Sequence, residues 1–279
     1  MQIKCPGVLR SNTSDRNRLP NGERGMSGKL ALILSITCAI IVVGCGGSSS
    51  TNNGTGSGNT LGLAQGAWSG TTTTGVSYES IILPNDKFYS VYGTMTGSSF
   101  LISGMMTGQG GSRDTSYSAS LTDFFSTGTV LPASLTASYV AGSSMNGTVS
   151  ESDYQIVFSG RPVPSSTFPY DTPATVASIQ GVWNGALLDG SAATVTINSD
   201  GTFTGSNSGC TFSGSAVPDA SGKNFFNVTI TFGGSPCVLP NQQATGIGVE
   251  YLLADRKTHQ LMVAASVGTS AGTAFVATR

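Results

Sequence analysis

The chain has 279 residues, of which 38 are Gly, and only 10% of its side chains are charged, a composition that is unusual for a soluble enzyme. The charge is unevenly distributed. Six of the 13 Lys and Arg residues lie at or before Lys29, and seven basic and twelve acidic side chains follow from Cys45 onward, a net charge of −5. This second part has no run of three basic residues and therefore no cluster that could bind phosphates. We expect no nucleic-acid binding.

An apolar segment follows the basic leader. Residues 30–43 read LALILSITCAIIVV, fourteen residues without a charge. This is too short to cross a hydrocarbon core of about 30 Å, which takes roughly 20 apolar residues. Lys29 before it and Gly44-Cys45 after it complete the pattern of a signal peptide. We therefore interpret residues 1–44 as a leader and signal peptide, with Met26 as the true translation start.

The end of this segment resembles the lipobox of bacterial lipoproteins, an aliphatic-small-small-Cys run. Val42, Val43, Gly44 and Cys45 match it at every position. The resemblance implies that Cys45 receives a diacylglycerol, that the chain is cut before it, and that two or three acyl chains then hold the protein on a membrane. Gly46 in the next position implies sorting to the outer membrane. The structural alternative is a buried Cys at the end of an ordinary helix.

The remainder of the chain contains an internal repeat. QGAWSG at 65–70 recurs as QGVWNG at 180–185, and these copies contain the chain's two tryptophans, Trp68 and Trp183. Each copy closes with an apolar run ending in arginine, Arg161 and Arg279. The domains expected from this repeat are a tether at 45–62, a first β-domain at 63–161, a Pro-rich linker at 162–175 and a second β-domain at 176–279.

Both copies have the alternating pattern of strands separated by turns, and neither has a helical period. The ranges expected to be strands in the first copy are 65–73, 76–83, 88–95, 99–107, 115–124, 133–142, 145–150 and 153–160. Those in the second are 180–188, 193–198, 201–206, 209–217, 224–232, 245–254, 259–267 and 271–278. Short connections favour an antiparallel meander, and eight such strands can close into a barrel. We predict an all-β protein of two tandem eight-stranded barrels, with β-sandwiches as the alternative.

This layout resembles the calycin-like barrels of lipocalins and avidins. Those proteins have Gly-x-Trp on the first strand and a basic residue near the end of the last strand, stacked on the indole. The resemblance implies two such pairs, Trp68 with Arg161 and Trp183 with Arg279. We interpret each as a cation–π lid over a barrel end, worth roughly 1 kcal/mol, and not as a ligand site.

The cysteines outside the leader form an even set once Cys45 is assigned to the lipobox. Cys210 and Cys237 remain. An exported protein matures in an oxidising compartment, so we expect them to form a disulfide. The loop that it closes would contribute roughly 3 to 4 kcal/mol in the chain-entropy model.

Groups that carry catalysis are scarce. The single histidine, His259, follows a charged turn, and no recognised nucleophile, metal or phosphate motif occurs. Asn198-Ser199-Asp200-Gly201 is expected to be a hairpin turn and not a calcium loop. We expect no catalytic residue, metal or cofactor, and a membrane-anchored binding or structural module. One alternative is a lipocalin-like carrier of a small apolar ligand, which requires a cavity of at least about 300 Å³. A hydrolase with paired carboxylates is the other.

Overall fold

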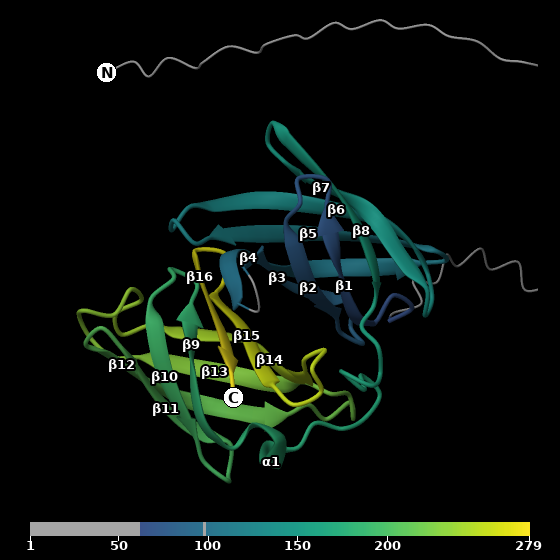
Figure 1. Ribbon diagram of the computed structural model, residues 1–279. Helices are drawn as coiled ribbons and strands as arrows, with labels where there is room; N and C mark the ends of the chain where they lie inside the picture. The colour runs from purple at the N-terminus through teal and green to yellow at the C-terminus, as the bar shows by residue number, and fades with distance from the viewer. Residues whose placement is uncertain (1–61, 97–98) are drawn as a thin grey trace, which may run out of the picture. The chain divides into compact units, whose positions relative to one another are not determined.

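The computed structural model describes residues 62–96 and 99–279, and this part of the chain forms two closed antiparallel barrels of eight strands each (Figure 1). The predicted fold is confirmed, and the β-sandwich alternative is wrong. In each barrel the first strand pairs with the last, β1 with β8 and β9 with β16. Both barrels belong to one compact unit.

The first barrel is a simple meander in which each strand pairs with the next. Its strands are β1 (Gly66–Thr72), β2 (Ser77–Ile82), β3 (Lys87–Thr96), β4 (Ser99–Arg113), β5 (Ser116–Phe125), β6 (Val130–Val140), β7 (Ser144–Glu151) and β8 (Tyr154–Pro162). The strands β4 and β6 are longer than the sequence pattern predicted. Gly and Ser residues at 108–112 hide the alternation in β4, and Pro132 interrupts it in β6.

The second barrel repeats this order after a single turn of helix, α1 (Val176–Ile179), which the sequence pattern did not predict. Its strands are β9 (Gly181–Leu187), β10 (Ala192–Ile197), β11 (Thr202–Asn207), β12 (Cys210–Pro218), β13 (Phe226–Phe232), β14 (Gln243–Leu252), β15 (His259–Val267) and β16 (Ala271–Thr278). A four-residue helix is too short to give a periodic signal. No helix in the described part of the chain has the length and apolar character needed to cross a membrane.

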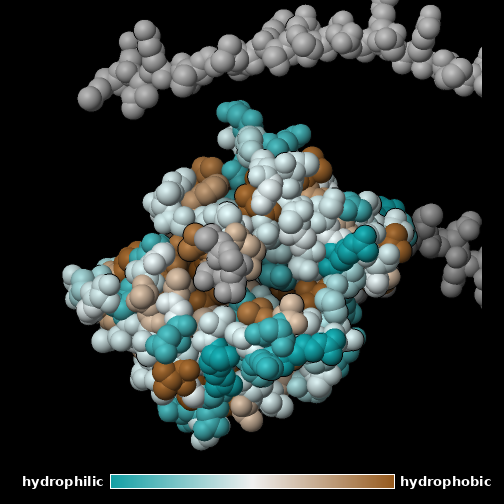
Figure 2. Space-filling model, viewed as in Figure 1, coloured by the Kyte–Doolittle hydropathy of each residue, from teal (hydrophilic) through white to brown (hydrophobic). Residues whose placement is uncertain are grey.

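Strand alternation separates an apolar interior from an exterior rich in serine and threonine. In β10, Val195 and Ile197 are buried while Thr194 and Thr196 are exposed. Neighbouring strands continue the outer row, in which the hydroxyl side chains paired across four strands are Thr196, Thr204, Ser213 and Thr231. Figure 2 shows the visible face mostly in the pale colours of near-neutral hydropathy. Serine and threonine thus replace charged residues on much of the outer wall.

The two barrels share an apolar interface. A core cluster there combines outward-facing side chains from both, chiefly Ile81, Tyr89, Met105, Phe124, Phe225, Ile247, Met262 and Ala274. Phe124 on β5 is only 1% exposed, and a Cβ placed on Gly272 of β16 would lie 2.5 Å from its ring. Glycine at 272 is therefore required for this approach. The Pro-rich segment also packs here, because Phe168 is buried and the Tyr170 hydroxyl donates to Ile82 O at 3.1 Å.

Candidate functional site

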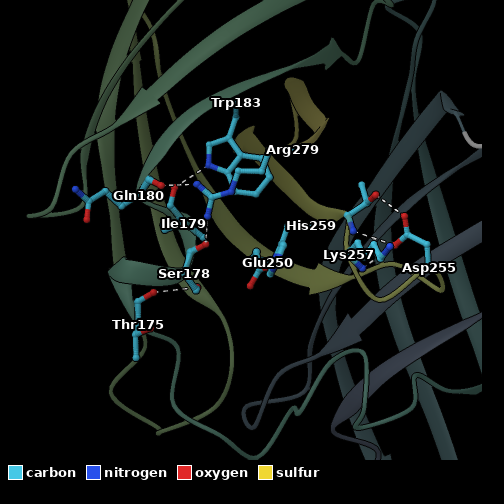
Figure 3. Close-up of polar contacts among 11 residues, drawn as sticks. Thr175, Ser178, Ile179, Gln180, Trp183, Glu250, Asp255, Lys257, His259 and Arg279 are labelled. Atoms are coloured by element: carbon cyan, nitrogen blue, oxygen red, sulfur yellow. Dashed lines mark hydrogen bonds and ion pairs between the residues drawn. The ribbon is translucent and has the colours of Figure 1, made fainter.

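One end of the second barrel is closed by α1, Trp183 and Arg279. The Trp183 indole is fully buried, and its Nε1 donates to Ile179 O at 2.7 Å. The Arg279 guanidinium lies 4.2 Å from the ring centre and donates to the carbonyl oxygens of Gln180 and Ser178 (Figure 3). The guanidinium thus stacks on the indole, the contact that the sequence predicted, and also binds carbonyl oxygens at the C-terminal end of α1.

The corresponding end of the first barrel has the tryptophan but not the arginine. Trp68 is 3% exposed, and its Nε1 donates to Ala64 O at 3.2 Å, four residues earlier as in the second barrel. Its partner across β8, however, is Pro162, while Arg161 pairs with Ser69. Directly paired residues share a face of the sheet, so Arg161 points outward and is exposed. The predicted Trp68–Arg161 pair is therefore wrong by one residue of register.

A buried aspartate replaces the arginine in closing this end. Asp86, in the turn between β2 and β3, is 0% exposed. Its Oδ1 accepts from Gly62 N at 3.3 Å and from Ser112 Oγ at 2.5 Å, and its Oδ2 accepts from Ser112 N at 3.3 Å. The Tyr117 hydroxyl donates to the Asp86 carbonyl at 2.8 Å. Sequence reasoning treated residue 86 only as part of a turn, and no local pattern distinguishes this aspartate from a solvated one.

The disulfide prediction is confirmed. The Sγ atoms of Cys210, at the start of β12, and Cys237, in the β13–β14 loop, lie 2.02 Å apart. Both cysteines are at most 6% exposed. The bond secures this loop, which carries Leu239 into the core, at the open end of the second barrel.

The interiors of both barrels are nearly filled by side chains. A cavity inside the first barrel measures about 90 Å³, and one inside the second measures about 40 Å³. A small-molecule pocket typically measures 300 to 1,000 Å³. The lipocalin-like alternative needs a larger space than either of these two cavities, because aromatic and aliphatic side chains occupy the lumens.

A larger space, the junction cavity, lies where the first barrel meets the open end of the second. It measures about 280 Å³ and lies between the β5–β6 turn of the first barrel and the turns at the end of the second. Its apolar walls include Phe124, Val130, Leu187, Phe232 and Leu239. Asp189 and Asn207 supply polar groups, and Cys210 of the disulfide also lines the space. No local sequence pattern indicated it, because it exists only between two domains.

The open end of the first barrel contains a pair of acids, the carboxyl pair Asp123 and Glu151. Asp123 is 1% exposed, and its Oδ1 accepts from the Tyr92 hydroxyl at 2.8 Å. Burial raises the pKa of Asp123 to about 8, the Tyr92 hydrogen bond opposes this shift, and Glu151 adds to it. Asp123 therefore retains its proton at higher pH than an exposed aspartate does. The two acids come from different strands, β5 and β7, so sequence spacing gave no sign of them.

This pair bears on the paired-carboxylate alternative. Glycoside hydrolases separate their two carboxyls by about 5 to 9.5 Å to admit substrate or water. The Asp123 side chain is instead only 1% exposed. A glycosidic bond therefore has no access to this carboxyl group.

The remaining candidates lie on the surface or outside the described residues. His259, the first residue of β15, is exposed, and its Nδ1 lies 2.5 Å from Oε1 of Glu250 on β14. Asp200 accepts from Thr202 N and Oγ1 in the predicted hairpin turn. Within residues 62–96 and 99–279, no group of three or more His, Cys, Asp or Glu side chains could hold a metal. Val42, Val43, Gly44 and Cys45 precede the described residues.

Comparison with known proteins identifies no family for this chain. No family model matches it. No curated protein matches it either. A solved structure of a protein of unknown function from the DUF3598 family of Nostoc punctiforme matches with 10% identity and a TM-score of 0.26, covering 79% of this chain and 98% of that one. Such a match carries no argument about function.

Proposed function

We propose that this protein is a non-enzymatic binding module of the cell envelope that takes a small, largely apolar molecule into the junction cavity. The observation that carries the proposal is the cavity itself, about 280 Å³ with aromatic and aliphatic walls and a few polar groups. This combination of an apolar body and few polar contacts is typical of small-molecule sites. The filled lumens of the barrels favour a site between the barrels over one inside them.

The proposal includes membrane anchoring through acyl chains on Cys45, with the outer membrane as destination. It is supported by the lipobox at 42–45 and by the uncharged Gly/Ser-rich tether that follows. Mass spectrometry of the N-terminal peptide from the full chain, together with membrane fractionation, tests it. We expect a diacylglycerol-modified Cys45 in the outer-membrane fraction. The Cys45→Ala variant should carry no acyl chain, so it should either be released from the membrane or keep its uncleaved signal peptide. An unmodified Cys45 in a soluble wild-type protein would refute the anchor.

The binding site is tested by filling it. Thr129 lines the cavity at the β5–β6 turn, whereas Thr127, on the same turn and equally exposed, does not. The full chain is screened by thermal denaturation against small apolar compounds, and hits are measured by calorimetry. Thr129→Trp should reduce the affinity at least tenfold, and the control Thr127→Trp should not. A screen without any hit, or hits that ignore Thr129→Trp, would count against the site.

A further inference from the structure

We propose that the junction cavity selects apolar molecules that carry a cationic ammonium group, and that the carboxylate of Asp189 binds this group. The inference rests on the proposed function, because it names the class of molecule that enters the same cavity. Three observations carry it: the charge of the lining side chains, the hydrogen bonds that orient their polar groups, and the size and apolar character of the walls.

The lining of the junction cavity has one formally charged side chain, and its charge is negative. Asp189 is this side chain, and the described residues that line the space include no Lys, Arg or His. Neither of the ion pairs in the described part of the chain involves Asp189. A carboxylate ligand would therefore meet a like charge and no counterion, whereas a cation would meet an opposite charge.

Hydrogen bonds in the β9–β10 turn hold the Asp189 carboxylate in place. Its Oδ1 accepts from the backbone N of Ser191 at 2.9 Å and from the Ser191 hydroxyl at 2.6 Å. The same hydroxyl accepts from Nδ2 of Asn207, on β11, at 2.8 Å. Both donors of Ser191 bind Oδ1, so Oδ2 of Asp189 keeps its capacity to accept from a ligand. A carboxylate that is already held loses less entropy when it binds.

Two other polar side chains of the lining also offer oxygen acceptors. Asn207 gives an N–H to Ser191, and its amide oxygen remains an acceptor. Ser270, in the β15–β16 turn, donates its hydroxyl hydrogen to Val267 O at 2.8 Å, which leaves the lone pairs of its oxygen. An ammonium group has three donors and no acceptor. It therefore suits this lining better than a carboxylate does, because a carboxylate only accepts.

The walls require an apolar body on the ligand. Phe124, Leu187, Phe232 and Leu239 line the space, whose volume is about 280 Å³. At about 30 Å³ for each water-sized group, this volume takes about nine such groups, which is the number of heavy atoms in n-octylammonium. Aromatic rings in the wall also attract an organic cation. The expected ligand is thus an amine with an apolar body of about this size.

The test compares three ligands that share one tail and differ in the charge of the head. n-Octylammonium, n-octanol and n-octanoate are each titrated by calorimetry into the full chain at neutral pH. Octylammonium should bind about fivefold more tightly than octanol, which is the upper end of the effect of an exposed ion pair, and octanoate should bind more weakly than octanol. In about 1 M NaCl the preference for octylammonium should largely disappear, because salt screens exposed charges.

Matched variants locate the charge that is responsible. Asp189→Asn removes the charge but keeps the size of the side chain, so it should weaken octylammonium binding about fivefold and leave octanol binding unchanged. Asp200→Asn is the control and should change neither affinity. Asp200 accepts from Thr202 N and Oγ1 in the β10–β11 turn, as Asp189 does from Ser191, but it does not line the cavity. Each variant is first checked for an unchanged circular dichroism spectrum.

The outcomes separate this inference from the proposed function. Equal binding of the three octyl ligands, or octylammonium binding that ignores Asp189→Asn, would overturn the preference for ammonium and leave the cavity as a binding site. The same holds if other apolar compounds bind there and octylammonium does not. An equal loss in Asp200→Asn would assign the effect to the net charge of the protein. If octylammonium binding ignores Thr129→Trp, the amine binds elsewhere and the inference is wrong. If no apolar compound binds at all, the proposed function fails as well.

Discussion

The guanidinium of Arg279 lies 4.2 Å from the ring centre of Trp183, in the second barrel, whereas Trp68 of the first barrel faces Pro162. The two copies therefore close the same end in different ways. One uses a cation–π contact with hydrogen bonds to α1, and the other uses the buried carboxylate of Asp86. Trp-to-Arg spacings of 93 and 96 residues conceal this difference, because a shift of one residue moves a strand side chain to the opposite face.

Replacing the two arginines should have unequal effects. Arg279→Ala removes the stacking on Trp183 and two hydrogen bonds to α1, so we expect a loss of about 1 to 2 kcal/mol in unfolding free energy. Arg161→Ala, on the outer wall, should change stability by less than about 0.5 kcal/mol. Urea denaturation followed by tryptophan fluorescence measures both. Equal losses would contradict the register described for β8.

Asp86 should be essential to the first barrel. Asp86→Ala leaves the Ser112 hydroxyl and two backbone amides without their buried acceptor. Each unmet buried group costs about 1 to 3 kcal/mol, so a loss of at least 3 kcal/mol is expected. Asp189→Ala, an exposed turn aspartate, is the control and should cost far less. Thermal denaturation compares the two variants.

Removing the disulfide should weaken the second barrel. Cys210→Ala with Cys237→Ala releases a loop that spans 27 residues, and the expected cost is roughly 3 to 4 kcal/mol. Urea denaturation of wild type in a strong reductant should approach the double variant. If the reductant changes wild type but not the variant, the effect belongs to this bond. An unchanged wild-type curve, with reduction verified by mass spectrometry, would contradict the estimate.

Stability should fall as the pH rises from about 4 to 8. Burial raises the pKa of Asp123 and of Glu79 to about 8 each. The folded state then binds more protons than the unfolded state, in which such acids titrate near pH 4, so their contribution is complete below pH 4 and is lost as the pH rises towards 8. The pKa of Asp255 is lowered to about 2, so this residue changes the pH dependence of stability only below about pH 4. Asp123→Asn and Glu79→Gln should each reduce the slope of unfolding free energy against pH. An unchanged slope in both would refute the assignment.

Replacing Gly104, over which the Tyr92 ring lies, should destabilise the protein unless the tyrosine is also shortened. Gly104→Ala places a methyl group where the Tyr92 ring lies, and overpacking of this kind costs about 1 to 3 kcal/mol. In the background of Tyr92→Ala the same substitution should cost less, because the overlapping atoms are gone. A double-mutant cycle measured in urea separates the two terms. Additive effects would show that the ring does not cross β4.

Much of the fold was predictable from local pattern. Alternation and short turns gave strands for both copies and predicted two closed barrels, and the repeated Gly-x-Trp located their first strands. Gly66 and Gly181 have φ of +144° and +119°, a conformation that favours glycine. The Cys210–Cys237 bond was predicted by counting the cysteines of a chain that its sequence predicts to be exported. These features depend on residues that are neighbours in the sequence or on an even number of cysteines, and both can be read from the sequence.

Tertiary structure alone decided which distant residues meet. The register of β8 directs Arg161 outward, and Asp123 and Glu151 lie on β5 and β7, which both pair with β6. The junction cavity arises from packing one barrel on the other, with Phe124 set against Gly272. By itself the sequence determined the strand pattern and the disulfide. The proposed binding site depends on the packing of the two barrels, because the residues that line the junction cavity come from distant parts of the sequence.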